Sequence, residues 1–284
     1  MNLINKNAQI IISDSNGQPM IKQNLSEYLV APNVSLQAGL YGNSLLDFLT
    51  QESFVNKDLK LAYILTGNSH ADATRIIGNI AEVLLVTYSK NNSAINKTLA
   101  KIARNGERET ASLNNYIALA TGSNITRDNY NQHYNPNDTQ RDLIWVHKDN
   151  IDLQLNCKGG NGLSSKPAGL QVKASHDGIN YVLPEIKSYV YPIIYFDLND
   201  DWGCVYQRLK DMGYHEPNLI HPDHVSSEIK VTLKGYFNLL VALFRNEITM
   251  QRIIDIAKYD CDTVLSAGIA ASDLNVSSKI YIPK

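Results

Sequence analysis

The segment Gly169–Ser175, GLQVKAS, carries the residue types and spacing that most directly suggest chemistry. Successive side chains of a β-strand point to opposite faces, so Gln171 and Lys173 would share one face of a strand. The side-chain carbonyl of a glutamine can serve as a neutral oxygen ligand for a hard cation. The neighbouring lysine adds a positive charge. Together these two residues could hold a metal ion and stabilise negative charge on a substrate.

A second polar face is predicted just upstream, in residues 151–157 (IDLQLNC), where Asp152 alternates with apolar side chains. If this segment pairs as a hairpin with GLQVKAS, through the connection KGGNGLSSKP, Asp152 would lie beside Gln171 and Lys173. Asp142, which opens the preceding predicted strand DLIWV, is the alternative aspartate if residues 151–157 are an insertion.

A further carboxylate lies in the strongest helical pattern of the chain, residues 71–89. Apolar residues recur there with a 3.6-residue period and also occupy much of the remaining circumference, which predicts a helix buried on several sides. The neighbours of Glu82 one turn away are Gly78, Leu85 and Val86. Because a buried carboxylate is costly unless it is paired or bound to a metal, Glu82 is a candidate functional acid.

These residue types match the requirements of phosphodiester hydrolysis, which needs a bound Mg²⁺, a positioned water and positive charge against the developing oxyanion. Asp152 and Glu82 would supply anionic oxygen ligands, and Gln171 would supply a neutral one. Lys173 would orient the attacking water and stabilise negative charge. We therefore expect a Mg²⁺-dependent phosphodiesterase.

The same residues resemble the motif of the PD-(D/E)xK, or restriction-endonuclease-like, nuclease superfamily. The resemblance consists of Glu82 in the helix IGNIAEVLL, Asp152 in IDLQL and the QxK variant in GLQVKAS, within residues 70–200. It implies an α/β fold with a mixed central sheet flanked by helices. It also implies Mg²⁺-dependent cleavage of DNA, with Lys173 as the catalytic lysine.

Two features depart from the family pattern. Gln171 stands where an acid is commoner, which removes one anionic metal ligand, and residues 177–188 leave little room for the usual helix before the next strand. Within the family, a stand-alone chain of this size suits a type II restriction enzyme that binds double-stranded DNA as a homodimer.

The same sequence pattern is compatible with other structures and functions. A solvated amphipathic hairpin would show the same alternation of polar and apolar residues. A nuclease of the same fold could act in phage defence, as a toxin or in repair, on DNA or RNA. A DNA-binding protein could also keep this fold without cutting. The histidines of HPDH (His221 and His224) are expected in a surface loop.

Composition limits the broader class. The chain has 284 residues, a formal net charge of −2 and 44% hydrophobic residues, which is typical of a globular protein. Its three cysteines are scattered without a CxxC spacing, so a reducing, cytoplasmic location is expected. No apolar stretch approaches the roughly 20 residues that span a bilayer, so no membrane partner is expected.

Three parts are predicted within one compact unit: an accessory segment (1–67), the nuclease core (68–215) and a helical segment (216–284). Further elements are expected throughout the chain. They are a strand at 9–12 with an Asn16–Gly17 turn, a short helix capped by Asn43, a helix-prone stretch at 94–119, a strand at 189–197, a helix from Asp200 or Asp201 to about Gly213, and helices at 233–246 and 250–259.

Overall fold

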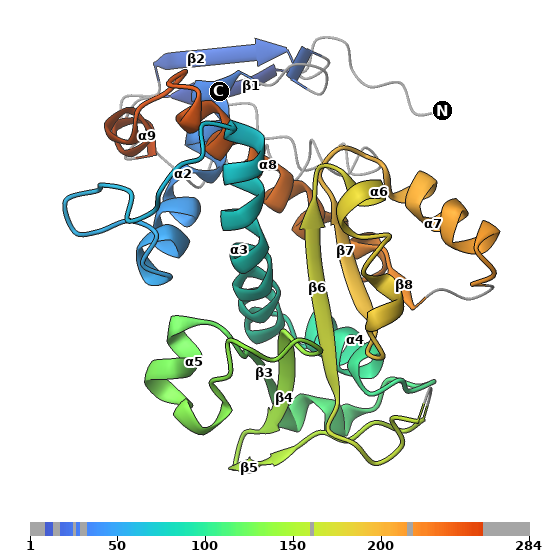
Figure 1. Ribbon diagram of the computed structural model, residues 1–284. Coiled ribbons are helices and arrows are strands. Elements are labelled where there is room, and N and C mark those ends of the chain that lie inside the picture. The colour runs from blue at the N-terminus through green and yellow to red at the C-terminus, as the bar shows by residue number, and fades with distance from the viewer. Residues whose placement is uncertain are drawn as a thin grey trace. The chain divides into compact units, whose positions relative to one another are not determined.

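The computed structural model describes residues 9–13, 18–24, 27–28, 33–159, 162–214 and 218–257 (Figure 1). The chain divides into two compact units. Met1–Ala73 and Val231–Lys284 form the first, and Thr74–Lys230 forms the second. The predicted accessory and C-terminal segments thus belong largely to one unit. Most of the predicted core 68–215 lies in the other.

The first unit contains a small antiparallel sheet of β1 (Gln9–Ser13) and β2 (Pro19–Asn24). It also contains α2 (Val34–Gln51), α9 (Met250–Ala257) and most of α8 (Ser227–Phe244). The predicted Asn16–Gly17 turn lies outside the described residues.

Helix α2 begins well before the predicted cap at Asn43. The side chain of Asn33 caps it by accepting a hydrogen bond from the Leu36 N–H at 3.1 Å. The helix then continues through Gly42, where a Cβ would lie only 2.9 Å from Ile253 Cγ2 of α9. Gly42, one residue before the predicted cap, is therefore a position of close helix–helix approach inside the helix.

The second unit holds most of the predicted long helix, which extends over Ser69–Asn91 as α3. Asn92 caps the helix that follows, and the other helices of this unit are short. They are α4 (Ser93–Ala103), α5 (Asn124–Asn129), α6 (Gly178–Tyr181) and α7 (Trp202–Asp211). Among the described helices, none combines the length and apolar composition needed to cross a membrane.

A mixed central sheet flanked by helices forms the core of the second unit, as predicted (Figure 1). The strands run in the order β3-β4-β6-β7-β8, and β5 pairs with β4 beside this path. β4 is antiparallel to β3 and to β6, whereas β6–β7 and β7–β8 are parallel. The strand bounds are β3 (Tyr116–Ala120), β4 (Leu143–His147), β5 (Asn150–Gln154), β6 (Gly169–Ser175), β7 (Ile193–Asp197) and β8 (Leu219–Ile220).

Strand β3 was predicted as part of a helix-prone stretch, and that prediction is wrong beyond Ala103. Alanine and leucine favour helices intrinsically, but tertiary packing overrides such small preferences. Leu119 is buried against Ile144 and Val146 of the neighbouring strand. This burial, which depends on a distant segment, makes the strand the better conformation.

The predicted hairpin between residues 151–157 and β6 forms only at its closed end, where Asn156 bridges Pro167 and the Ala168 N–H donates to the Leu155 carbonyl at 2.7 Å. It does not continue into β5 and β6, so the predicted pairing of Asp152 with Gln171 is wrong. β5 folds back on β4 instead, with His147 opposite Asn150. β6 takes the other half of the same edge of β4, where Leu143 faces Leu170. A two-residue connection closes the β4–β5 hairpin at a smaller entropic cost than the long loop that precedes β6.

The two faces of the sheet are covered by different elements. On one face, the short connection after β6 contains only α6 and a 3₁₀ turn at Ile186–Ser188, in agreement with the limited room predicted there. With α7 it buries Ile193 and Tyr195 of β7. Towards α4, the indole N–H of Trp145 donates to the buried Asn96 Oδ1 at 3.0 Å.

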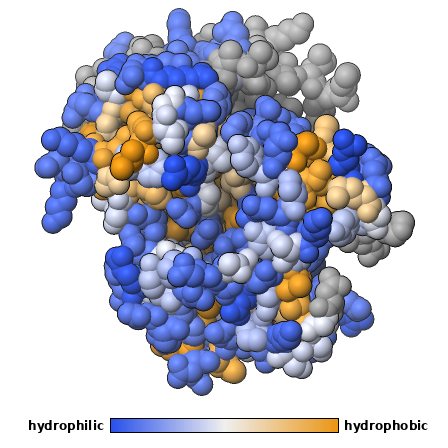
Figure 2. Space-filling model, viewed as in Figure 1, coloured by the Kyte–Doolittle hydropathy of each residue, from blue (hydrophilic) through white to orange (hydrophobic). Residues whose placement is uncertain are grey.

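The outer surface is mostly hydrophilic on the face in Figure 2, with apolar side chains in small patches. Large apolar side chains of the second unit with at least a third of their surface exposed are Ile125, Leu153, Ile179, Tyr181, Val190 and Met212. They come from several separate elements. Exposed apolar residues scattered in this way are ordinary for a globular protein.

Gly169, the first residue of β6, packs closely against the side chain of Arg141, and a substitution there can test this contact. A Cβ there would lie 2.6 Å from Arg141 Cγ and Cδ and 2.9 Å from its Cβ. Arg141 cannot move away without disturbing its ion pair with Asp138 at 3.0 Å. We expect Gly169→Ala to lower the free energy of unfolding by about 1–3 kcal/mol in urea denaturation.

Gly203→Ala is the matched control, because Gly203 lies in α7 and a Cβ there meets nothing within 4 Å. This variant should be neutral or slightly stabilising. Equal stability of both variants would contradict the proposed packing constraint.

Candidate functional site

Asp142 meets the β6 strand where β4 begins. The antiparallel register pairs Leu143 with Leu170 and Ile144 with Gly169. Just before β4, the regular register ends, because the Asp142 N–H also donates to the Leu170 carbonyl at 2.9 Å. Asp142 therefore lies against the part of β6 that carries Gln171 and Lys173.

A side-chain hydrogen bond fixes the carboxylate of Asp142. Its Oδ2 accepts from the Val172 N–H at 2.7 Å, while its own N–H donates to the Leu170 carbonyl at 2.9 Å. On its other side, its carbonyl accepts from the Thr121 N–H at 2.8 Å. Asp142 thus joins the end of β3 to the middle of β6.

Burial raises the pKa of the Asp142 carboxyl to about 6. The Val172 N–H and the positive charge of Lys173 act in the opposite direction, and the negative charge of Asp138 adds to the increase. The favourable contacts therefore do not compensate fully for the loss of water around the anion. A cation beside Asp142 would supply that compensation.

Gln171, the residue before Val172, carries an unsatisfied acceptor. The residue is 5% exposed, and its side-chain Oε1 is buried with no hydrogen-bond partner among the described residues. Leaving a buried polar atom without a partner costs about 1–3 kcal/mol, so such an atom needs an explanation. The carbonyl oxygen predicted as a neutral metal ligand is available for that role.

Lys173 lies two residues further along the same strand and is half-buried. Its Nζ donates to Glu185 Oε2 at 3.0 Å and lies 4.8 Å from the centre of the Tyr189 ring. Burial lowers the pKa of Lys173, but the hydrogen bonds and charges of Tyr189 and Glu185 outweigh it and raise the pKa overall. The side chain is thus held as an ammonium ion.

Glu82 approaches the end of β3 from helix α3. The residue is half-buried, and its Oε2 lies 3.9 Å from the position of a Cβ built on Gly122. Gly122 follows Thr121, whose backbone N–H and side-chain hydroxyl both bind the Arg141–Asp142 segment. Glu82 and Asp142 therefore reach the same end of the sheet.

Asp152 does not join this group. It lies in β5, which pairs with the far half of β4, and its side chain is exposed. Its expected position beside Gln171 required the hairpin to continue into β5 and β6, which it does not. Asp142, the alternative aspartate named from the sequence, is instead the carboxylate that binds the β6 backbone.

The residues present suit a hard cation bound through oxygen atoms. Asp142 offers a carboxylate that burial leaves short of positive charge, and Gln171 offers an orphaned carbonyl oxygen. Within the described part of the chain, no three His, Cys, Asp or Glu side chains form a metal-binding group. A metal site at this position would therefore need a neutral oxygen ligand, and the amide oxygen of Gln171 is one candidate.

Glu185 and Tyr189 are site residues that sequence reasoning missed. They are four residues apart around a 3₁₀ turn, and Tyr189 Oη donates to Glu185 Oε2 at 3.3 Å. The sequence feature that could have identified them is a Glu and a Tyr four residues apart, shortly after the QxK strand. The residues around them in the sequence do not indicate, however, that they contact Lys173.

The loop histidine His221 belongs to a separate cluster. Its Nε2 lies 3.9 Å from Oδ1 of the buried Asp197 at the end of β7, and Lys230 Nζ lies 2.9 Å from the same oxygen. Burial lowers the pKa of His221. These contacts join β7, the loop after β8 and the start of α8. They therefore give the cluster a structural role.

Comparisons of the chain with protein-family models, curated proteins and solved structures gave no match.

The pKa of Asp142 predicts a specific pH dependence of stability. Because the pKa is higher in the folded chain than in the unfolded one, the protonated carboxyl stabilises the fold most below pH 4. This contribution is lost as the pH rises through about 6. In EDTA, Asp142→Asn keeps an oxygen for the Val172 N–H and removes the charge. Relative to the wild type, the variant should gain at most about 3 kcal/mol of unfolding free energy between pH 4 and pH 7.5.

The measurement is urea denaturation of both proteins across this pH range. A difference between them that does not change with pH would show that Asp142 has an ordinary pKa in the folded chain.

Proposed function

We propose that this protein is a Mg²⁺-dependent DNA endonuclease with a restriction-endonuclease-like core. The observation that carries the proposal is the buried Asp142 carboxylate bound to the Val172 N–H of β6, next in sequence to Gln171 with its unpartnered carbonyl oxygen and near a lysine held as a cation. Acidic and amide oxygens next to an ammonium group are what phosphodiester hydrolysis requires of a protein.

In this proposal Asp142 and Gln171 hold the metal ion, and Glu82 provides a further carboxylate from the same end of the sheet. When bound, Mg²⁺ would polarise the phosphodiester and favour attack by water. The hydrogen bond from the Val172 N–H occupies one oxygen of Asp142. The bond keeps the carboxylate in place and leaves its second oxygen for the cation.

Lys173 acts as a cation and not as a base. Since its pKa is raised, it stays protonated at neutral pH and donates hydrogen bonds. We propose that it orients the attacking water and stabilises charge on the phosphate. Glu185 holds the ammonium group and positions it, and the exposed Glu185 side chain can move when a phosphate competes for Lys173.

The element order also supports this class of nuclease. The helix with Glu82, three antiparallel strands, a connection and a parallel strand occur in this order as α3, β3, β4, β6, α6 and β7, with α4, α5 and β5 inserted between them. The resemblance then extends the proposal to a type II restriction enzyme that cuts double-stranded DNA as a homodimer. Discrete fragments from plasmid DNA would favour restriction over general degradation.

Lys173→Ala is the direct test of catalysis. We expect cleavage of plasmid DNA in Mg²⁺ to fall by about 10²–10³-fold, because the variant loses a charge that acts on the developing oxyanion. Folding and DNA binding should be largely preserved, since the remaining partner, Glu185, is exposed and readily hydrated.

Lys187→Ala serves as the control, because Lys187 is an exposed lysine in the same region, on the 3₁₀ turn after Glu185. It should retain wild-type cleavage. Full activity of Lys173→Ala would reject the site, and DNA binding without cleavage in the wild type would favour the non-cleaving alternative.

Metal binding can be tested separately from cleavage. Mg²⁺ that binds only the folded chain raises the midpoint of thermal unfolding in a concentration-dependent way. We expect Gln171→Met, which keeps the length of the side chain and removes Oε1, to reduce this shift strongly. Asp142→Asn should abolish it.

Asp152→Asn is the matched carboxylate control, since Asp152 is exposed on β5. It should show the wild-type Mg²⁺ shift. An equal Mg²⁺ shift in all four proteins would place the metal elsewhere.

A further inference from the structure

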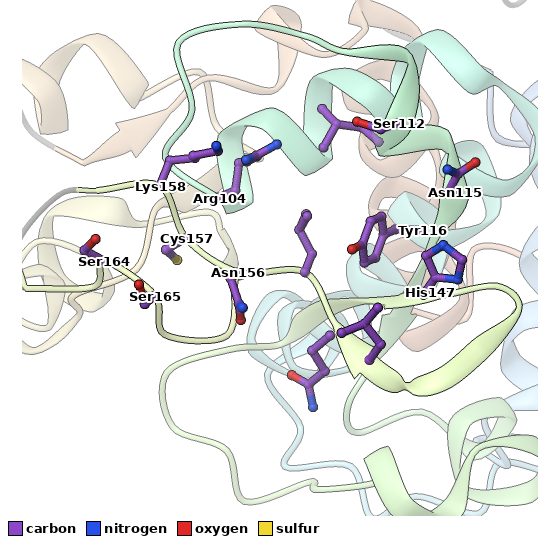
Figure 3. Close-up of a pocket in the computed structure, with 14 residues that line it drawn as sticks. Arg104, Ser112, Asn115, Tyr116, His147, Asn156, Cys157, Lys158, Ser164 and Ser165 are labelled. Atoms are coloured by element: carbon purple, nitrogen blue, oxygen red, sulfur yellow. The ribbon is translucent and has the colours of Figure 1, made fainter.

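The second unit contains a cavity of about 560 Å³ at the end of β4 away from Asp142 (Figure 3). His147, the last residue of β4, lines it, whereas Asp142 precedes the first. Five residues of extended strand span about 17 Å, so this cavity and the candidate catalytic site are distinct places. Its volume lies within the range of about 300–1,000 Å³ that is usual for small-molecule sites.

One end of the cavity is positively charged. Arg104, at the C-terminus of α4, and the exposed Lys158 lie together there (Figure 3). None of the described residues that line the cavity is acidic, and neither cation has an ion pair within the described part of the chain. The Nε of Arg104 is buried without a hydrogen-bond partner there. This charge is thus not neutralised by neighbouring side chains.

Backbone contacts hold this cationic end in shape. The Lys158 N–H donates to the Arg104 carbonyl at 2.7 Å, which ties the loop after β5 to the end of α4. The Ser165 N–H donates to the Cys157 carbonyl at 3.1 Å. Ser164 and Ser165 line the same side of the cavity and add hydroxyl groups to the two cations (Figure 3). Cations and hydroxyls together suit a phosphate group.

The other end is aromatic. Tyr116 of β3 and His147 of β4 are opposite each other in the sheet, and their rings meet edge to face with centroids 5.2 Å apart (Figure 3). Leu153, 46% exposed, adds an apolar surface to the lining. A planar aromatic ring of a ligand could stack against such a surface, as nucleic-acid bases do on aromatic side chains.

We propose that this cavity binds a nucleotide, with its phosphate at Arg104 and Lys158 and its base at Tyr116 and His147. The spatial separation of a cationic, hydroxyl-rich end from an aromatic end carries the inference. The chemistry fits both a free nucleoside monophosphate and a nucleotide within a DNA strand. The site does not depend on the proposed nuclease activity, since it shares no residue with the candidate catalytic group.

Isothermal titration calorimetry on the full-length chain tests the proposal. The ligands are each of the four deoxynucleoside 5′-monophosphates, inorganic phosphate, the matching deoxynucleosides and a 5′-phosphorylated single-stranded tetranucleotide, in EDTA. At least one monophosphate or the tetranucleotide should bind more tightly than phosphate or nucleoside alone. Preference for the monophosphate identifies a free nucleotide, and preference for the tetranucleotide identifies a strand.

Two variants separate the ends of the site. Lys158→Gln should weaken binding about tenfold or more, as expected for loss of a charged hydrogen bond. Tyr116→Leu should weaken nucleotide binding and leave phosphate binding unchanged. Lys166→Gln is the control, because Lys166 is an exposed lysine of the same loop that does not line the cavity. Absence of nucleotide binding, or equal weakening by Lys158→Gln and Lys166→Gln, would overturn the proposal.

Discussion

The hydrogen bond from the Val172 N–H to Asp142 Oδ2, 2.7 Å long, is the contact on which the candidate site depends. In a regular antiparallel ladder, a backbone carbonyl of the neighbouring strand would accept from such an N–H. Here a side chain accepts instead, and the Asp142 carbonyl is left to bind Thr121 at the end of β3. One residue therefore joins three strands, and its carboxylate is held against the backbone of β6 away from bulk water.

This arrangement leaves an excess of oxygen acceptors. The pKa of Asp142 rises to about 6 because burial outweighs the N–H and the Lys173 charge, and Gln171 Oε1 has no partner among the described residues. Lys173 cannot supply the full compensation, because Glu185 also holds its ammonium group. A divalent cation would supply the positive charge that Asp142 lacks. The cost of burying these oxygen atoms is the reason that we propose a metal ion there.

Strand β4 organises both regions to which we assign a function. It is buried along most of its length, pairs with β3 along one edge, and shares its other edge between β6 and β5. The start of the strand meets β6, and acidic and amide oxygens gather there. The end of the strand meets β5 and carries His147 into the nucleotide cavity. Because β5 and β6 share one edge of β4, the two ends of this strand have chemically different surroundings.

The sequence by itself determined the features that depend on local geometry. The two-residue period of a strand set Gln171 and Lys173 on one face, and the helical period located α3 and Glu82. Only the tertiary structure decided that Asp142 and not Asp152 binds the QxK strand, that residues 116–120 form a strand, and that Glu185 holds Lys173. Side-chain periodicity is fixed within a few residues of chain. Strand partners and register instead depend on loop closure and on burial between segments far apart in the sequence.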